Sequence, residues 1–345
     1  MGHFIENIYE QLRRHPKRIL YPEGNNPRIL EAAREYIDRK LGVTVLLGDR
    51  DEIHAVAEKL GIDLKRMMLI DPTNAADLPL FIRRLETLNR YKGIKNQEAE
   101  RILKNPNYFG AMMLQNGQCD GLVAGAGQYS GNILRPLFQL IKPLPHIKTI
   151  SSCMILDIPD CPFGDQGVLF FADAGVVPNP TVEQLSEIAM ETAWLRRQLS
   201  GKMPRVAFLS YSTKGSAITP GTEKIVAGIA LTRQKLEQHG IDAKVDGELQ
   251  VDAALIPEIA QLKASGSEVA GQADVLIFPD LNSGNISAKL VQLLSGATAY
   301  GQVLLGLSKP AAELSRGAKT EDVVGVSALV AIQAIEYRKL YPDAN

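Results

Sequence analysis

The stretch CDGLVAGAGQYSGNILRP, residues 119–136, combines an apolar run, a glycine-rich loop and an arginine in a pattern that could bind phosphate. Residues 121–124 predict a strand, the glycines that follow are spaced GxGxxxG from Gly125, and Arg135 lies in the helix-like segment beyond them. Backbone N–H groups and the positive end of a helix dipole attract anions, and a guanidinium can grip two phosphate oxygens. We therefore expect an anion site at this strand end.

Two other interpretations of this loop have to be weighed. A dinucleotide-binding fingerprint follows the first strand of its fold, and an acidic residue stands about 20 positions later. Neither condition is met here, which disfavours a dinucleotide. A turn that needs glycine only for its backbone geometry stays open.

Polar residues also follow two later apolar runs, FLSYSTKGSA (208–217) and IFPDLNSGNISAKL (277–290). Neither contains a Walker loop or a GxSxG elbow, and helix capping is the simpler interpretation of their hydroxyl and amide groups. Ligands of open α/β sheets nevertheless bind beyond the carboxyl ends of strands, where such groups converge. The candidate substrate-binding residues of the three loops are Ser130, Asn132, Ser212, Thr213 and Asn285.

The segment LSRGAKTEDVVG, residues 314–325, holds the densest set of reactive side chains. Ser315 and Arg316 precede a glycine, and Asp322 stands at the start of the final apolar helix. The arginine and the aspartate could serve as an anion clamp and a base. They could equally be a solvated charge and a helix cap.

Composition excludes several other classes of function. The chain has 345 residues with 38 basic and 39 acidic side chains, so we expect no nucleic-acid partner and no anionic membrane surface. Its five histidines show no HExxH or Cys/His spacing, so no metal site is expected. Its three cysteines form no CxxC pair and are most simply buried apolar residues.

The N-terminal residues 1–18 predict an amphipathic helix and lack the apolar core of a secretion signal. No segment approaches the run of about 18 apolar residues that a membrane-spanning helix needs. We therefore expect a cytoplasmic protein that does not enter the membrane.

Short β-branched runs alternate with helical stretches, which is typical of a mostly parallel sheet covered by helices. The length and the number of strands favour two α/β domains. The linker KPLPHIK (142–148) is the best candidate for a domain crossing, because its prolines cannot continue a helix. Helices are expected at 27–41, 51–60, 96–116, 181–199, 222–239, 253–264, 284–294 and 322–340.

The chain resembles the phosphate acetyl/butyryltransferase family over nearly its whole length. The motifs that carry this resemblance are YPEG, MMLQNGQCDGLVAGA, LRPLFQLIK, FADAGVVPNPT, EIAMETA, LSYSTKGSA, DGELQVDAA, VAGQADVLIFPDLNSGNI and KPAAELSRGA. The resemblance implies a phosphate acetyltransferase, which transfers an acetyl group between acetyl phosphate and coenzyme A by direct thiolate attack. Coenzyme A is then a substrate, and no cofactor is expected.

The resemblance also implies the fold and the assembly. We expect two three-layer α/β/α domains with the active site in a cleft between them, similar to the isocitrate/isopropylmalate dehydrogenase-like fold, and a homodimer. The first domain would comprise residues 1–145 plus 296–345, and the second would comprise residues 146–295. The chain would return to the first domain near Gly296.

Residue roles follow from the matching motifs. Ser315 would hydrogen-bond the coenzyme A thiol, Arg316 would hold the acetyl phosphate or the developing oxyanion, and Asp322 would take the thiol proton. Arg135 would bind the phosphoryl group. The resemblance therefore favours a small acyl phosphate as the anion of the glycine loop.

This chain departs from the family pattern at several of these places. Asn89 replaces an arginine that often binds substrate, and Arg90 stands next to it as a candidate substrate-binding residue. Many relatives carry His and Asp where this chain has Gln128 and Asn132, and a small hydroxyl residue where it has Tyr129. The alternatives are a preference for propionyl or butyryl groups, or a sensor that binds coenzyme A or acyl phosphate without turnover.

Overall fold

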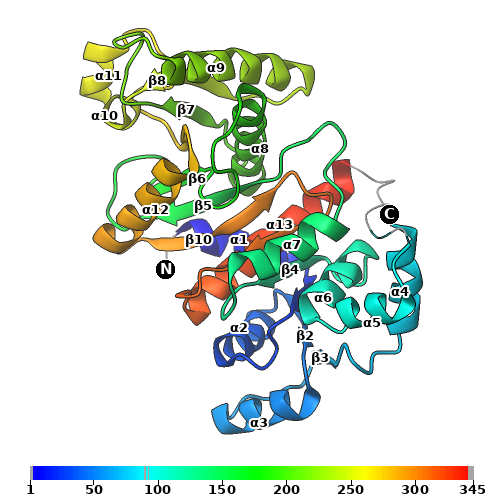
Figure 1. The fold of residues 1–345 in the computed structure, drawn as a ribbon. Helices are drawn as coiled ribbons and strands as arrows, with labels where there is room; N and C mark the ends of the chain where they lie inside the picture. The colour runs from blue at the N-terminus through cyan, green and yellow to red at the C-terminus, as the bar shows by residue number, and fades with distance from the viewer. Residues whose placement is uncertain (1–2, 89–90, 92, 341–345) are drawn as a thin grey trace. The chain divides into compact units, whose positions relative to one another are not determined.

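The computed structural model describes residues 3–88, 91 and 93–340, and its contacts divide the chain into two compact units (Figure 1). Unit 1 comprises Met1–Phe4 and Pro143–Gly306, and unit 2 comprises Ile5–Lys142 and Leu307–Asn345. The predicted return to the first domain was placed near Gly296. Strand β10 (Thr298–Leu305) belongs to unit 1 instead, because it pairs with β5 (Ser151–Asp157) of that unit.

Unit 2 contributes five adjacent strands in the order β3-β2-β1-β4-β11, and all neighbours among them are parallel. Parallel strands are buried on both faces and therefore consist of nearly continuous apolar runs, as the fully buried β4 does. The strands are β1 (Lys17–Tyr21), β2 (Gly42–Leu47), β3 (Met67–Ile70), β4 (Gly121–Ala124) and β11 (Ala311–Glu313).

The helices of unit 2 connect these strands, and α13 packs closely on β4 and β1. A Cβ atom at Gly121 would come within 2.3 Å of Val330, so glycine is needed for this approach. The Tyr21 hydroxyl meets the Ser327 hydroxyl at 2.8 Å in the same buried layer. The helices are α1 (His3–Arg14, in unit 2 from Ile5 on), α2 (Pro27–Asp38), α3 (Arg50–Leu60), α4 (Leu78–Thr87), α5 (Asn96–Leu103), α6 (Pro106–Gln115), α7 (Ser130–Leu140) and α13 (Thr320–Leu340).

Unit 1 contributes six adjacent strands in the order β10-β5-β6-β9-β7-β8. Strand β5 pairs antiparallel with both β10 and β6, and the remaining neighbours are parallel. The mixed sheet was not predicted, because buried antiparallel and parallel strands have the same apolar composition. The further strands are β6 (Val168–Ala172), β7 (Arg205–Leu209), β8 (Lys244–Leu249) and β9 (Val275–Ile277).

Helices α8 (Val182–Ser200) and α9 (Pro220–Gln238) pack against each other in unit 1. A capping box starts each helix, from Thr181 and from Thr219, and fixes where it begins. The core includes the stacked rings of Phe171 and Phe278, whose centroids are 5.3 Å apart. The other helices of this unit are α10 (Val251–Leu255), α11 (Pro257–Lys263) and α12 (Leu281–Ser295). The predicted α/β class is thus confirmed in both units.

Candidate active site

The glycine loop after β4 binds an anion that belongs to the protein itself. The carboxylate of Glu23 accepts hydrogen bonds from the backbone N–H groups of Gly125, Ala126 and Gly127 at 2.6, 2.9 and 2.8 Å. Glu23 follows β1 in the motif YPEG and is only 7% exposed. These three N–H groups therefore bind a carboxylate of the chain itself. The sequence had predicted instead that they would bind a substrate phosphate.

Gly125 itself is needed for backbone geometry. Its φ is +112°, and a Cβ atom there would lie 2.8 Å from the carbonyl oxygen of Leu314. The turn interpretation that the sequence left open is consistent with this conformation. The glycine also lets β4 and the segment after β11 approach each other, since the N–H of Leu314 donates to the carbonyl of Ala124 at 2.7 Å.

The start of α7 offers a second place for an anion. Tyr129 is the N-cap residue, and its side chain makes no capping hydrogen bond, although its backbone carbonyl accepts the N–H of Asn132 at 2.9 Å. Ser130, Asn132 and Arg135 lie on the first turns of α7 and are exposed. Within the described part of the chain, no hydrogen bond or ion pair holds the Arg135 guanidinium. Anions bind at such helix starts when a cation stands nearby.

The loop after β11 lies against the glycine loop in unit 2. The guanidinium carbon of Arg316 is 4.7 Å from the centroid of the Tyr129 ring, within the range of a cation–π contact. Ser315 is half-buried, and its hydroxyl oxygen lies 3.4 Å from the N–H of Gly317. The structure thus brings Ser315 and Arg316 to the same side of unit 2 as the start of α7.

Asp322 lies in the first turn of α13 and caps that helix. Its carboxylate accepts a hydrogen bond from the backbone N–H of Lys319 at 2.8 Å. Asp322 is the third residue of the helix and Lys319 precedes its first, so this bond is the reciprocal half of a capping box, consistent with the simpler interpretation of the sequence. A capping carboxylate remains a proton acceptor, so its role as the base stays a prediction.

Glu313 is a buried carboxyl group that the sequence reasoning missed. It ends β11 and is only 7% exposed, and burial raises the pKa of its carboxyl group, although a hydrogen bond from the Ser130 side chain opposes this shift. The signal in the sequence was a single glutamate inside the apolar run AAEL. Its bond to Ser130 ties the start of α7 to the end of β11.

The candidate residues of unit 1 are held by internal hydrogen bonds. The Ser212 hydroxyl is fully buried and donates to the Glu248 carboxylate at 2.9 Å, and that carboxylate also accepts the N–H of Gly215 at 2.7 Å. The Thr213 hydroxyl accepts the N–H of Gln250 at 2.9 Å. These bonds give both residues a structural role in unit 1, and their substrate-binding role stays a prediction.

Asn285, near the start of α12, donates from its side-chain amide to the carbonyl of Ala174 at 2.8 Å. Asp173 stands directly before Ala174, and its carboxyl group is 3% exposed. It accepts hydrogen bonds from the N–H of Val177 at 2.7 Å and from the Ser152 hydroxyl at 2.5 Å. Burial raises the pKa of the Asp173 carboxyl group, and its hydrogen bonds counteract this rise. Glu23, Asp173 and Glu248 thus each accept hydrogen bonds from backbone N–H groups in a loop that follows a strand.

Asn89 and Arg90, the two other positions named from the sequence, lie outside the described residues.

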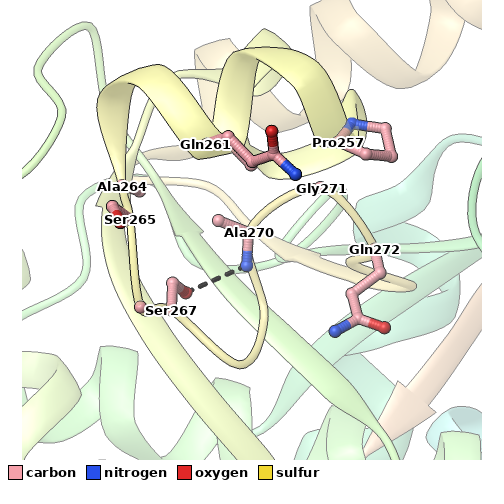
Figure 2. Close-up of a pocket in the computed structure, with 10 residues that line it drawn as sticks. Pro257, Gln261, Ala264, Ser265, Ser267, Ala270, Gly271 and Gln272 are labelled. Carbon is pink, nitrogen blue, oxygen red and sulfur yellow. Dashed lines mark hydrogen bonds between the residues drawn. The ribbon is translucent and has the colours of Figure 1, made fainter.

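A cavity of about 300 Å³ lies at the end of α11 in unit 1, between residues 257 and 272 (Figure 2). Small and uncharged side chains line it, and the Ser267 hydroxyl accepts the N–H of Ala270 at 3.0 Å, as the dashed line in Figure 2 shows. A neighbouring cavity of about 510 Å³ is lined by Lys214, Arg233 and Lys244, and each of these cations already pairs with a carboxylate. None of the predicted site residues lines either cavity.

Comparisons with known proteins show the family of the chain. The family model for phosphate acetyl/butaryl transferase matches residues 3–331. The phosphate acetyltransferase of Acetivibrio thermocellus is 42% identical over 331 residues, which cover 96% of this chain and 98% of that protein. The structure of the EutD phosphotransacetylase from Staphylococcus aureus superposes with a TM-score of 0.87 at 34% identity, over 96% of this chain and 98% of that one.

The fold and the sequence together define an α/β enzyme of the acyltransferase class. The chain belongs to the phosphate acetyl/butaryl transferase family. The family, the enzyme class and the phosphate acetyltransferase function inferred from the sequence are thereby confirmed.

The predicted relation to a dehydrogenase-like fold is also confirmed. A 4-hydroxythreonine-4-phosphate dehydrogenase from Klebsiella pneumoniae matches with a TM-score of 0.52 at 12% identity, over 92% of this chain and 98% of that one, which shows a shared fold alone. Among the described residues, no helix has the length and apolarity that crossing a membrane requires.

Proposed function

We propose that this chain transfers an acetyl group between acetyl phosphate and coenzyme A through the residues of unit 2 described above. The observation that carries this proposal is the contact of Arg316 with Tyr129, because it joins the loop of Ser315 to the start of α7. A hydroxyl, a guanidinium and a helix start in one place suit a reaction in which negative charge builds on an acyl phosphate.

The reaction begins with removal of the thiol proton. A free thiol has a pKa near 8.5 and is mostly protonated at neutral pH, and the thiolate is the nucleophile. Asp322 accepts this proton, and Ser315 orients the sulfur by a hydrogen bond. The sulfur then attacks the carbonyl carbon of acetyl phosphate. A C–S bond forms, the bond between the carbonyl carbon and the bridging oxygen breaks, and phosphate leaves with that oxygen and the electron pair.

Two arginines stabilise the negative charge that develops in this step. Arg316 stabilises the negative charge on the carbonyl oxygen and the departing phosphate, which are both more negative in the transition state than in the substrate. Arg135, exposed on α7, binds the phosphoryl group. Direct transfer of this kind needs only a base and fixed cations, so we propose that coenzyme A and acetyl phosphate are the partners and that no cofactor is required.

We also propose that the protein works as a homodimer in the cytoplasm. On α12, Ile286, Leu290, Leu293 and Leu294 are 57%, 52%, 78% and 83% exposed, and their spacing places them on one face. Such an apolar stripe supports contact with a second copy of the chain. Light scattering of the purified protein tests the dimer, and a monomeric mass at micromolar concentration would refute it.

The proposed location in the cytoplasm has a separate support. The free thiols of Cys119 and Cys153 are consistent with a reducing compartment.

The function is tested by thioester formation with coenzyme A and, in turn, acetyl, propionyl and butyryl phosphate. We expect the highest kcat/KM with acetyl phosphate. A preference for a longer acyl group would contradict the acetyl preference and make the substitutions around Tyr129 candidates for substrate selection. One methylene changes discrimination by about 1–3 kcal/mol. Binding of coenzyme A without turnover on any acyl phosphate would make the chain a sensor and refute the proposal.

A further inference from the structure

Arg28, in the first turn of α2, is bound to the backbone of two loops of the candidate active site. Its guanidinium donates to the carbonyl oxygens of Arg316 and Ala318 at 2.9 and 2.6 Å. The same guanidinium donates to the carbonyl oxygen of Ala126 in the glycine loop. One side chain therefore links residues 125–129 to residues 315–318, although 288 positions separate Arg28 from Arg316.

The turn that presents Arg28 is itself fixed. Asn26 caps α2 by accepting the N–H of Arg28 at 3.0 Å, and its own N–H donates to the carbonyl of Glu23 at 3.0 Å. The side chain of Glu23 takes the three N–H groups of the glycine loop. The segment YPEGNNPR thus binds the glycine loop through its N–H groups, at Glu23, and through a carbonyl, at Arg28.

The geometry requires an arginine at this position. A guanidinium has five N–H donors in a planar fork and can serve three carbonyls at once, whereas the lysine ammonium is a point charge on a flexible stem. The carbonyl of Arg316 belongs to the residue whose side chain lies over Tyr129. A shift of that backbone would move the Arg316 guanidinium relative to Ser130 and Arg135.

We propose that Arg28 is a positioning residue for acyl transfer, which holds the loop of Ser315 and Arg316 at the distance from the start of α7 that the reaction needs. The inference rests on the proposed function of these loops. Arg28 acts through the backbone that it binds, and the reacting groups remain those of Ser315, Arg316 and Asp322.

The test uses Arg28→Lys and Arg28→Met, with Arg34→Met as the matched control. Arg34 lies on the same helix and also donates to two backbone carbonyls, those of Asp63 and Lys65, at 2.9 and 3.0 Å. A misplacement of about 1 Å can lower turnover by about 100-fold. We expect kcat/KM for thioester formation to fall by about 10- to 100-fold in both Arg28 variants and to stay within about twofold of the unsubstituted chain in the control.

A double-mutant cycle separates positioning from general loss of structure. If Arg28 acts through the Arg316 loop, Arg28→Met should lower kcat/KM by less than about threefold in an Arg316→Gln background. The full effect in that background would overturn the proposal. The proposal would also be overturned if the melting temperature of Arg28→Met fell further than that of Arg34→Met while kcat stayed unchanged, because Arg28 would then have only a structural role.

Amide hydrogen exchange tests the same claim without turnover. In Arg28→Met, exchange should become faster over residues 125–129 and 315–319, whereas the control should keep the exchange of the unsubstituted chain there. Unchanged exchange in Arg28→Met would overturn the inference. Absence of thioester formation by the unsubstituted chain would instead contradict the proposed function, so the two failures can be told apart.

Discussion

The Arg316 guanidinium lies 4.7 Å from the centroid of the Tyr129 ring, which is itself 70% exposed. The contact joins two segments that are far apart in the sequence, the N-cap of α7 and the loop after β11. Because the ring has a negative face, it holds the cation without neutralising it. The contact thus places the Arg316 guanidinium at the N-cap of α7.

Replacing the aromatic ring should weaken this placement. In Tyr129→Ser the Arg316 side chain loses a contact that is worth about 0.5–1 kcal/mol at an exposed site, so we expect KM for acetyl phosphate to rise by about two- to fivefold. Tyr129→Phe keeps the ring and should change KM less. Steady-state kinetics measure both variants. An equal rise in KM in the two would mean that the hydroxyl, and not the ring, matters.

The exposed guanidinium on α7 should act on phosphate selectively. In Arg135→Gln we expect KM for acetyl phosphate to rise by about tenfold or more, because an ion-paired, charge-assisted contact is lost. The affinity for coenzyme A, measured by calorimetry, should change little. Arg101→Gln on the exposed side of α5 is the control and should resemble the unsubstituted chain. Equal weakening of both ligands by Arg135→Gln would count against a local phosphate role.

Stability should depend on pH through Glu191, in α8. Burial, aided by repulsion from Glu187, raises the pKa of the Glu191 carboxyl group from 4.5 to about 7, and a hydrogen bond from the backbone of Gly306 opposes this shift. Between these pH values the folded chain holds the proton more tightly than the unfolded chain does. The free energy of unfolding therefore falls as pH rises from about 4.5 to about 7 and then levels off.

Glu191→Gln removes this dependence, because the amide stays neutral. Relative to the unsubstituted chain, we expect its free energy of unfolding to be higher by up to about 3 kcal/mol at about pH 8, and nearly equal at about pH 4.5. Urea unfolding at the two pH values measures the difference. The exposed Glu237→Gln in α9 is the control. A stabilisation that is the same at both pH values would show that Glu191 does not titrate in this range.

Glu23 should be important for the stability of unit 2. In Glu23→Gln the neutral amide can accept fewer of the three loop N–H groups, and its own NH₂ group faces other donors. Hydrogen bonds to a charged group contribute about 1.5–3 kcal/mol, so we expect a loss of about 2–3 kcal/mol on chemical denaturation. Glu52→Gln, an exposed partner of Asn25, should cost less than about 1 kcal/mol. A result for Glu23→Gln no larger than that of Glu52→Gln would be evidence against the internal anion.

Sequence patterns predicted the local structure around the site well. Strand β4, the glycine turn, helix α7 and the capping position of Asp322 all follow from periodicity and from rules that act within a few residues. The segment expected as one helix at 96–116 is instead two, α5 and α6, because Asn105 caps a new helix that has Pro106 at its first position.

The features of the site that the sequence did not predict depend on contacts between segments that are far apart in the chain. The anion of the glycine loop proved to be Glu23, 102 positions before Gly125, and no local pattern shows that pairing. Arg28 was overlooked for the same reason, since a single arginine near a helix start is common. Family motifs located the loop of Ser315 and Arg316, but only the fold shows that Tyr129 lies beneath the guanidinium.

The proton transfer to Asp322 is the central step of the proposed reaction, and one comparison tests it most directly. Asp322→Asn keeps a capping oxygen for the Lys319 N–H but removes the base, whereas Glu321→Gln removes the neighbouring charge from the same helix turn. We expect kcat for thioester formation from acetyl phosphate to fall by about 100- to 10,000-fold in Asp322→Asn, with the affinity for coenzyme A retained, and to stay unchanged in Glu321→Gln. Unchanged kcat in Asp322→Asn would contradict the account.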